Sequence, residues 1–286
     1  PAVSTGAAIG SNVASMFHMN AKTRMLLIGC ATAGAMSSMF KAPVAAIVFA
    51  VEIFSLDLVF TSLVPLLLAS VAAVITSYFF RGTDVLFSFE LLDAWRVKDI
   101  VFYVFLGVAT GIASVYFSKM YFLITRFFAW FSNAYVKIGI AALAIGLMLY
   151  LFPPLYGEGY GLINNLLNGE TEAAFNGIQY QIDFNNVWIV IAILLIIAVF
   201  KAIAMTTTFA AGGVGGIFIP TLFMGSALGN SVAKVINQFG FEVSESNFTL
   251  IGMTGLMAGV LHAPLTAIFL IAEITGGYDL FVPLML

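Results

Sequence analysis

The chain has 286 residues, of which 62% are hydrophobic and only 9% are charged, and its formal net charge is −3. A soluble domain carries about 25% charged residues and could not hide so much apolar surface. This composition excludes a water-soluble globule, and the small net charge gives no reason to expect a nucleic-acid partner. The apolar runs are long, unlike the alternating segments of outer-membrane barrels, so we expect an all-α, multi-pass integral membrane protein of the cell membrane.

Both ends of the sequence resemble cuts through a longer chain. The chain starts with Pro1 and stops at Leu286, inside the apolar stretch 281–286. No pattern typical of a signal peptide opens the sequence. We therefore expect the natural protein to extend beyond both ends.

Four uncharged runs are each long enough to cross a bilayer once, since a spanning helix needs about 20 apolar residues. These runs are residues 58–80, 100–118, 138–157 and 184–200. Other apolar segments are short or are interrupted by Gly and Pro, and they are residues 25–40, 43–53, 202–233 and 246–272, of which only 43–53 holds a charged residue, Glu52. Interrupted segments of this kind are the best sequence indication of a binding site in a transporter.

The charged residues predict how the chain is oriented in the membrane. Lys119, Arg126 and Lys137 lie near the connection between two long runs, whereas residues 157–186 are acidic and contain no Lys or Arg. Because basic residues favour the cytoplasmic side, we expect residues 119–137 in the cytoplasm and residues 157–186 outside. Residues 81–99 are mixed in charge and indicate neither side.

The sequence contains one pattern twice. Residues 1–14 align with residues 220–233 at an offset of 219, and residues 40–53 align with residues 261–274 at an offset of 221. Repeats in membrane transporters are often inverted, with the substrate where the two copies meet. We expect one transmembrane domain over residues 1–286, divided into residues 1–80 (remainder of the first repeat half), 81–99 (linker) and 100–286 (second half).

A glycine-rich stretch over residues 212–220 ends in Pro220 and is the most informative motif. Glycine allows unusual backbone conformations and close approach of a ligand, and proline suits the first turn of a helix. The free N–H groups at such a helix start suit an anion. Residues 202–233 hold no Lys or Arg, so partial charges alone would bind the anion weakly enough for it to leave. The alternative is that these glycines only permit tight helix packing.

Two carboxylates occupy matching places in the repeat. Glu52 and Glu273 each follow an Ala-Pro pair and lie inside an apolar run. A carboxylate in such a run is a candidate functional group. The alternative is a helix-end Glu that is paired locally or faces the interface.

The remaining reactive residue types are isolated. His18 and His262 stand alone, and His262 aligns with Lys41 of the other copy, so both histidines are interpreted as structural. Cys30 is the single cysteine and excludes an internal disulfide. These residues offer no nucleophile–base pair and no metal cluster, so we predict neither enzymatic activity nor a metal site.

Three motifs in the same order resemble the CLC family of chloride channels and transporters. Residues 215–220 resemble the family's Gly-x-Phe-x-Pro signature, and residues 258–268 are similar to its late helix pair. Residues 1–10 resemble the helix that follows a Gly-Arg/Lys-Glu-Gly-Pro signature, with Pro1 as its last residue. The resemblance runs through the whole chain. It implies a homodimer in a lipid bilayer, with two inverted halves per subunit and many tilted or partially crossing helices.

The resemblance also implies roles for particular residues. Chloride or a similar small anion would be held by backbone amides, those of Gly216, Ile217, Phe218 and Ile219. Gly215, Pro220 and Pro1 would belong to the pathway or to helix starts along it. The family's gating Glu would sit two residues before Pro1, and its pore Ser and pore Tyr would also fall outside this sequence. No cofactor is implied, because chloride is the substrate.

One departure from the family pattern concerns proton coupling. Proton-coupled members often show Glu-Glu where this chain has Glu52-Ile53, and Ile cannot carry a proton. We therefore expect a passive or weakly coupled anion channel, with a chloride/proton antiporter as the alternative. Glu52 is a possible proton acceptor near the inner mouth. A cation transporter that uses Glu52 and Glu273 is a further alternative.

Overall fold

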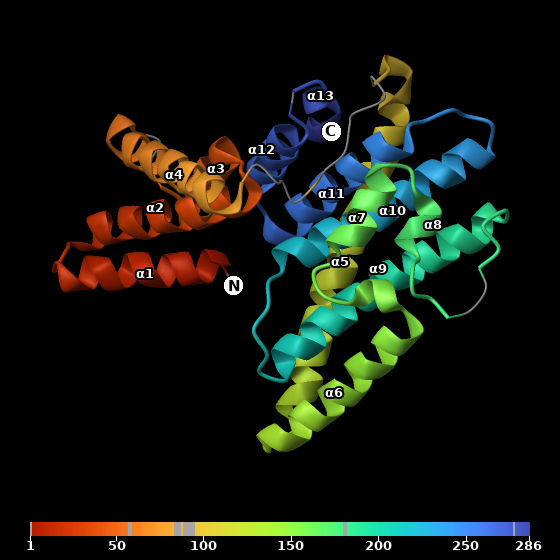
Figure 1. Ribbon diagram of the computed structural model, residues 1–286, viewed down its shortest axis with the longest axis horizontal. Coiled ribbons are helices and arrows are strands. Elements are labelled where there is room, and N and C mark those ends of the chain that lie inside the picture. The colour runs from red at the N-terminus through yellow and green to blue at the C-terminus, as the bar shows by residue number, and fades with distance from the viewer. Residues whose placement is uncertain (1, 57–58, 83–86, 88–94, 180–181, 277) are drawn as a thin grey trace. The chain divides into compact units, whose positions relative to one another are not determined.

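The computed structural model describes residues 2–56, 59–82, 87, 95–179, 182–276 and 278–286, and the regular elements in this part of the chain are helices (Figure 1). The predicted all-α class is confirmed. The chain packs as two compact units, Pro1–Ser88 with Ala263–Tyr278, and Phe89–His262 with Asp279–Leu286. The expected repeat halves stay a prediction, and most of the expected 81–99 linker lies outside the described residues.

The first unit is built around α2. Its helices are α1 (Ala2–Met16), α2 (Ala21–Phe40), α3 (Pro43–Phe54), α4 (Phe60–Arg81) and α12 (Pro264–Ile274). The Asn20 side chain caps α2 by accepting a hydrogen bond from the Thr23 amide at 2.8 Å, which satisfies one of the free donors of the first turn. α2 packs against α1, α3 and α4, and α3 packs against α12.

The second unit is built around α10. Its helices are η1 (Val97–Asp99), α5 (Ile100–Ala129), α6 (Ala134–Leu151), η2 (Pro153–Leu155), α7 (Tyr160–Leu167), α8 (Thr171–Ala174), α9 (Val187–Ala210), α10 (Phe218–Gln238), α11 (Glu245–Leu261) and α13 (Phe281–Met285). α10 packs most extensively against α11, and it also packs against α9, α7 and α5.

The long helices fit a protein that crosses a membrane several times. Among the described residues, four helical segments are long and apolar enough to span a bilayer, namely Phe60–Arg81, Val97–Ala129, Ala134–Leu151 and Val187–Ala210. They correspond to the four runs expected from the sequence, with shifted ends. Lys119 and Arg126 lie within α5, because that helix continues well past the end expected for it at residue 118.

Glycines set the closest helix crossings in both copies of the repeat. A Cβ added to Gly225 or Gly229 on α10 would lie 2.4 or 2.1 Å from backbone oxygens of α11. The matching Gly6 and Gly10 on α1 would meet backbone oxygens of α2 at 2.7 and 2.9 Å. Such distances leave no room for a side chain, so these glycines allow two helix backbones to touch. The repeated sequence therefore encodes the same helix–helix crossing twice.

The backbone before each Ala-Pro pair is also repeated. Lys41 ends α2 with φ 56°, and His262 ends α11 with φ 55°, both in the left-handed region. A left-handed residue just after the last turn of a helix ends that helix. Ala42 (φ −120°, ψ 80°) and Ala263 (φ −129°, ψ 68°) then take similar conformations before Pro43 and Pro264 open the next helices. The shared requirement at Lys41 and His262 is thus a backbone conformation, which fits the interpretation of His262 as structural.

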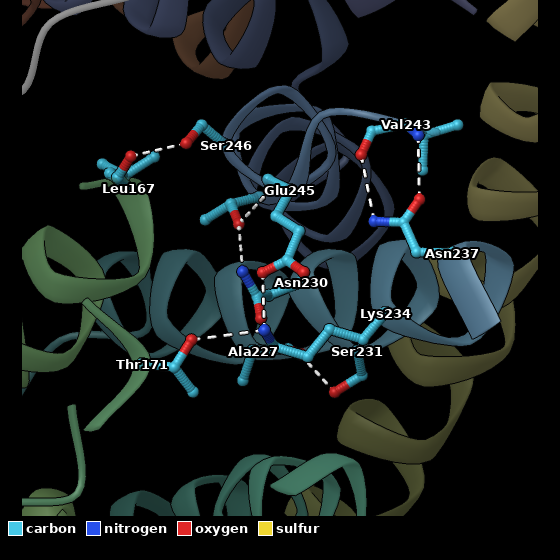
Figure 2. Close-up of polar contacts among 11 residues, drawn as sticks. Leu167, Thr171, Ala227, Asn230, Ser231, Lys234, Asn237, Val243, Glu245 and Ser246 are labelled. Atoms are coloured by element: carbon cyan, nitrogen blue, oxygen red, sulfur yellow. Dashed lines mark hydrogen bonds and ion pairs between the residues drawn. The ribbon is translucent and has the colours of Figure 1, made fainter. Parts of the chain in front are cut away.

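A polar cluster joins three helices of the second unit. Figure 2 shows the Lys234 ammonium between Thr171 and Glu245: its Nζ donates to Thr171 Oγ1 at 3.2 Å and to Glu245 Oε2 at 2.6 Å. Lys234 thereby ties α10 to the start of α8 and the start of α11. Lys234 and Thr171 also line a pocket of about 920 Å³, with Glu170, Glu172 and Asn176 among its other lining residues. None of its lining residues belongs to the 211–217 loop.

Candidate functional site

The glycine-rich motif forms a break between two helices. α9 ends at Ala210, residues 211–217 form a loop, and α10 begins at Phe218. The helix therefore starts two residues before Pro220, which was expected to open it. The difference has a simple cause: Phe218, Ile219 and Pro220 all belong to the first turn, where no amide needs an intrahelical acceptor. Pro220 thus still lies where its missing N–H costs nothing.

The loop glycines are required by geometry. Gly212 has φ 95°, a conformation that residues with a side chain rarely adopt. A Cβ added to Gly213 would lie 2.8 Å from the Thr208 carbonyl oxygen, so the loop can fold against the end of α9 only with glycine there. Val214, at the tip, is 83% exposed. The tight-packing alternative therefore describes Gly225 and Gly229 of α10 better than it describes this loop.

Amide groups around the start of α10 differ in their hydrogen bonding. The loop amides of Gly212 and Gly213 bond back to carbonyls of Phe209 and Thr208 at 2.9 Å each. Within the described residues, the amides of Ile217 and Ile219 have no hydrogen-bond partner. The first backbone bond in α10 runs from the Thr221 amide to the Ile217 carbonyl at 3.1 Å. Unpaired amides and the positive end of a helix dipole make this point suited to a negative charge.

The predicted site residues from 215 to 220 lie together at the end of this loop and in the first turn of α10. Gly215 and Gly216 precede the cap residue Ile217, and Phe218 and Ile219 open α10. Ile219 is buried, while Gly215 to Phe218 are partly exposed. Their role in anion binding stays a prediction. Pro1, the other predicted helix start, lies outside the described residues.

Glu52 and Glu273 are engaged at helix starts of the first unit. Glu273 accepts hydrogen bonds from the amides of Val44 and Ala45 at 3.0 and 2.7 Å. Glu52 accepts from the amides of Leu265 and Thr266 at 3.2 and 2.9 Å and from the Thr266 hydroxyl at 2.7 Å. Both carboxylates thus have partners on another helix, 213 to 229 residues away in sequence.

Sequence reasoning missed Lys201. This residue lies on α9, one position before the uncharged segment 202–233, and only 3% of its surface is exposed. Its Nζ donates to the carbonyls of Leu155 at 3.1 Å and Gly157 at 2.9 Å, and it lies 4.5 Å from the centre of the Phe223 ring. A basic residue inside a long apolar run was the signal that could have found it.

Comparison with known proteins places the whole chain in one family. The sequence pattern of the family described as "Voltage gated chloride channel" matches residues 1–286. The chain is 28% identical to the H(+)/Cl(-) exchange transporter ClcA of Vibrio cholerae, over all of this chain and 59% of that protein. It is 26% identical to the chloride channel protein CLC-f of Arabidopsis thaliana, over all of this chain and 37% of that protein. The chain thus spans about three fifths of the Vibrio relative.

Solved structures share the fold. A slow cyanobacterial Cl−/H+ antiporter superposes with a TM-score of 0.79 at 22% identity, over 99% of this chain and 64% of that one. A CLC-type fluoride/proton antiporter superposes with a TM-score of 0.73 at 22% identity, over 99% of this chain and 66% of that one. The family expected from the three motifs is confirmed: the chain belongs to the voltage-gated chloride channel family, the CLC family.

Proposed function

We propose that the protein transports chloride or a similar small anion across a membrane, and that the anion binds at the start of α10. The observation that carries this proposal is the pair of unpartnered amides, those of Ile217 and Ile219, where the chain is broken between α9 and α10. Irregular backbone at membrane depth is tolerated only where it is buried in protein or lines a cavity. Gly216 and Phe218 lie in the same short segment and belong to the proposed site.

An anion site formed by backbone amides suits transport, which requires weak binding, better than it suits tight anion binding. The loop itself contains no charged side chain, so the anion would be held by partial charges and released readily. We propose no cofactor and no enzymatic activity, with chloride as the transported substrate. A homodimer in a lipid bilayer, with one pathway per subunit, is part of the same proposal.

Exchange of chloride for protons is supported better than the passive channel that Ile53 suggested. Two similar proteins are named as an H(+)/Cl(-) exchange transporter and a Cl−/H+ antiporter. Because Ile53 cannot carry a proton, coupling in this protein would need another group, and Glu52 is the candidate next to it. A proton on Glu52 would weaken the bonds that this carboxylate accepts from Leu265 and Thr266. Protonation at Glu52 would therefore loosen the start of α12.

The anion site is tested by Gly216→Leu in the full-length protein reconstituted into liposomes. We expect this bulky side chain to abolish chloride flux while the protein still assembles, as judged by size-exclusion chromatography. Gly146→Leu is the matched control, because a Cβ at Gly146 meets open space, and it should leave the flux unchanged. Normal chloride flux through Gly216→Leu would reject the assigned loop.

The coupling is tested by the reversal potential under a pH gradient. An exchanger predicts a potential that shifts with pH at a fixed chloride-to-proton ratio. A potential that follows the chloride gradient alone would reject exchange and support a passive channel. Replacing chloride by a large impermeant anion distinguishes anion transport from cation transport. The current would disappear if the protein transports anions and would persist if it transports cations.

A further inference from the structure

Lys201 is a buried basic residue that has no role in the proposed anion site as described so far. It lies on α9, the helix that leads into the glycine-rich loop, and it is 3% exposed. Its ammonium donates to the carbonyls of Leu155 and Gly157 at 3.1 and 2.9 Å and lies over the face of Phe223, 4.5 Å from the ring centre. Two carbonyl acceptors and an aromatic face are surroundings that stabilise an ammonium ion.

These partners do not cancel the charge. Carbonyl dipoles and a ring quadrupole carry only partial charges. Among the described residues, no carboxylate lies within salt-bridge distance of Lys201. Glu158, which is exposed and belongs to the same turn as Gly157, acts on Lys201 electrostatically from farther away. When Lys201 is protonated, its positive charge is therefore not neutralised by an ion pair inside the second unit.

This charge lies close to the start of α10. Phe223, which the ammonium contacts, follows Phe218 by five residues, a helical rise of about 7.5 Å. The ammonium is therefore on the order of 10 Å from the first-turn amides, too far for direct contact with an anion there. At an effective dielectric constant of about 20, a unit charge at that distance changes a binding equilibrium roughly tenfold.

We propose that Lys201 is a positioning residue whose positive charge sets the affinity of the α10 site for its anion without touching it. This inference rests on the proposed function. The simpler alternative is that Lys201 only holds the turn at residues 155–159 against α10, where a Cβ at Gly159 would lie 2.3 Å from the Phe223 ring. That alternative predicts a loss of stability in neutral variants and no change in the affinity of the protein that folds.

The experiment compares neutral and charged replacements in the full-length protein in liposomes. Lys201→Gln keeps amide donors for the two carbonyls but removes the charge, and Lys201→Arg keeps the charge. We expect Lys201→Gln to raise the half-saturating chloride concentration of flux roughly tenfold, while Lys201→Arg stays within about threefold of the unmodified protein. An unchanged half-saturating concentration in folded Lys201→Gln overturns the inference.

A second variant tests the inference if Lys201→Gln does not assemble. Glu158 is exposed and its charge opposes that of Lys201, so Glu158→Gln should lower the half-saturating chloride concentration. An unchanged or raised value overturns the inference. Failure of this inference about Lys201 can be distinguished from failure of the proposed function. Absence of chloride flux in the unmodified protein, or normal flux in Gly216→Leu, defeats the function itself, whereas unchanged affinity in an active protein defeats only the role of Lys201.

Discussion

Glu52 and Glu273 each cap the helix that carries the other. The Glu273 carboxylate on α12 accepts from the first-turn amides of α3 at 2.7 and 3.0 Å, and the Glu52 carboxylate on α3 accepts from those of α12 at 2.9 and 3.2 Å. Neither helix has a side-chain cap from its own N-cap alanine. A carboxylate at a helix start is stabilised both by the free amides and by the helix dipole. Each copy of the repeat thus supplies the carboxylate that caps a helix of the other copy.

Neutralising these caps should destabilise the protein. Glu52→Gln should lower stability by about 1–2 kcal/mol, because a charge-assisted bond to an amide is replaced by a neutral one. Glu273→Gln should cost less, since Glu273 lacks the third bond that the Thr266 hydroxyl gives to Glu52. The melting temperature of the purified protein in detergent measures both effects. Two variants as stable as the unmodified protein would contradict reciprocal capping.

Glycine-to-alanine substitutions should lower stability where two helix backbones touch and should not lower it at glycines that face open space. Gly229→Ala places a methyl group 2.1 Å from the Phe248 carbonyl oxygen, so helices α10 and α11 must move apart. Overpacking of this kind costs about 1–3 kcal/mol or more. Gly146→Ala, where space is open, should leave stability unchanged or raise it by up to about 1 kcal/mol, because alanine favours a helix interior more than glycine does. Melting temperatures and the yield of assembled protein provide the comparison, and equal behaviour of the two variants would refute the crossing.

The elements could be predicted from the sequence because they depend on local patterns. Uncharged runs of sufficient length gave the four long helices, and the repeated Ala-Pro pairs gave the starts of α3 and α12. The break after α9 was indicated by the glycines that precede Pro220. Its details depended on a single turn, in which Phe218 rather than Pro220 begins the helix.

Interactions between distant segments could not be predicted in the same way. Glu52 meets an amide 213 residues farther along the chain, and no local pattern specifies that pairing. Lys201 finds its partners 44 and 46 residues upstream, and no pattern near Lys201 in the sequence indicates those two carbonyls. The repeat showed that His262 and Lys41 were equivalent, but the left-handed backbone they share became evident only from the fold.

The Lys234–Glu245 ion pair should contribute measurably to the stability of the second unit. The side chains are 11% and 30% exposed, and the two charged groups lie 2.6 Å apart, so the pair is partly shielded from water. A double-mutant cycle with Lys234→Met and Glu245→Gln should give a coupling energy of about 1–2 kcal/mol. Thermal unfolding of the four proteins provides the measurement, and a coupling energy near zero would show that the contact in Figure 2 adds no stability.

Glycine at position 262 should stabilise the protein. His262 holds φ 55° at the end of α11, and a left-handed conformation is unfavourable for a residue with a side chain. The His262 side chain has no hydrogen bond within the described residues. His262→Gly should therefore raise stability by about 0.5–1 kcal/mol. A lower melting temperature than that of the unmodified protein would show that the imidazole has a role of its own.

The most direct test of the account locates the anion itself. Crystals of the full-length protein soaked in bromide should show an anomalous peak within about 3.5 Å of the amide nitrogens of Ile217 and Ile219 at the start of α10. Bromide bound only at lysine or arginine side chains, with those amides engaged by protein carbonyls, would contradict the claim that unpaired backbone amides bind the transported anion.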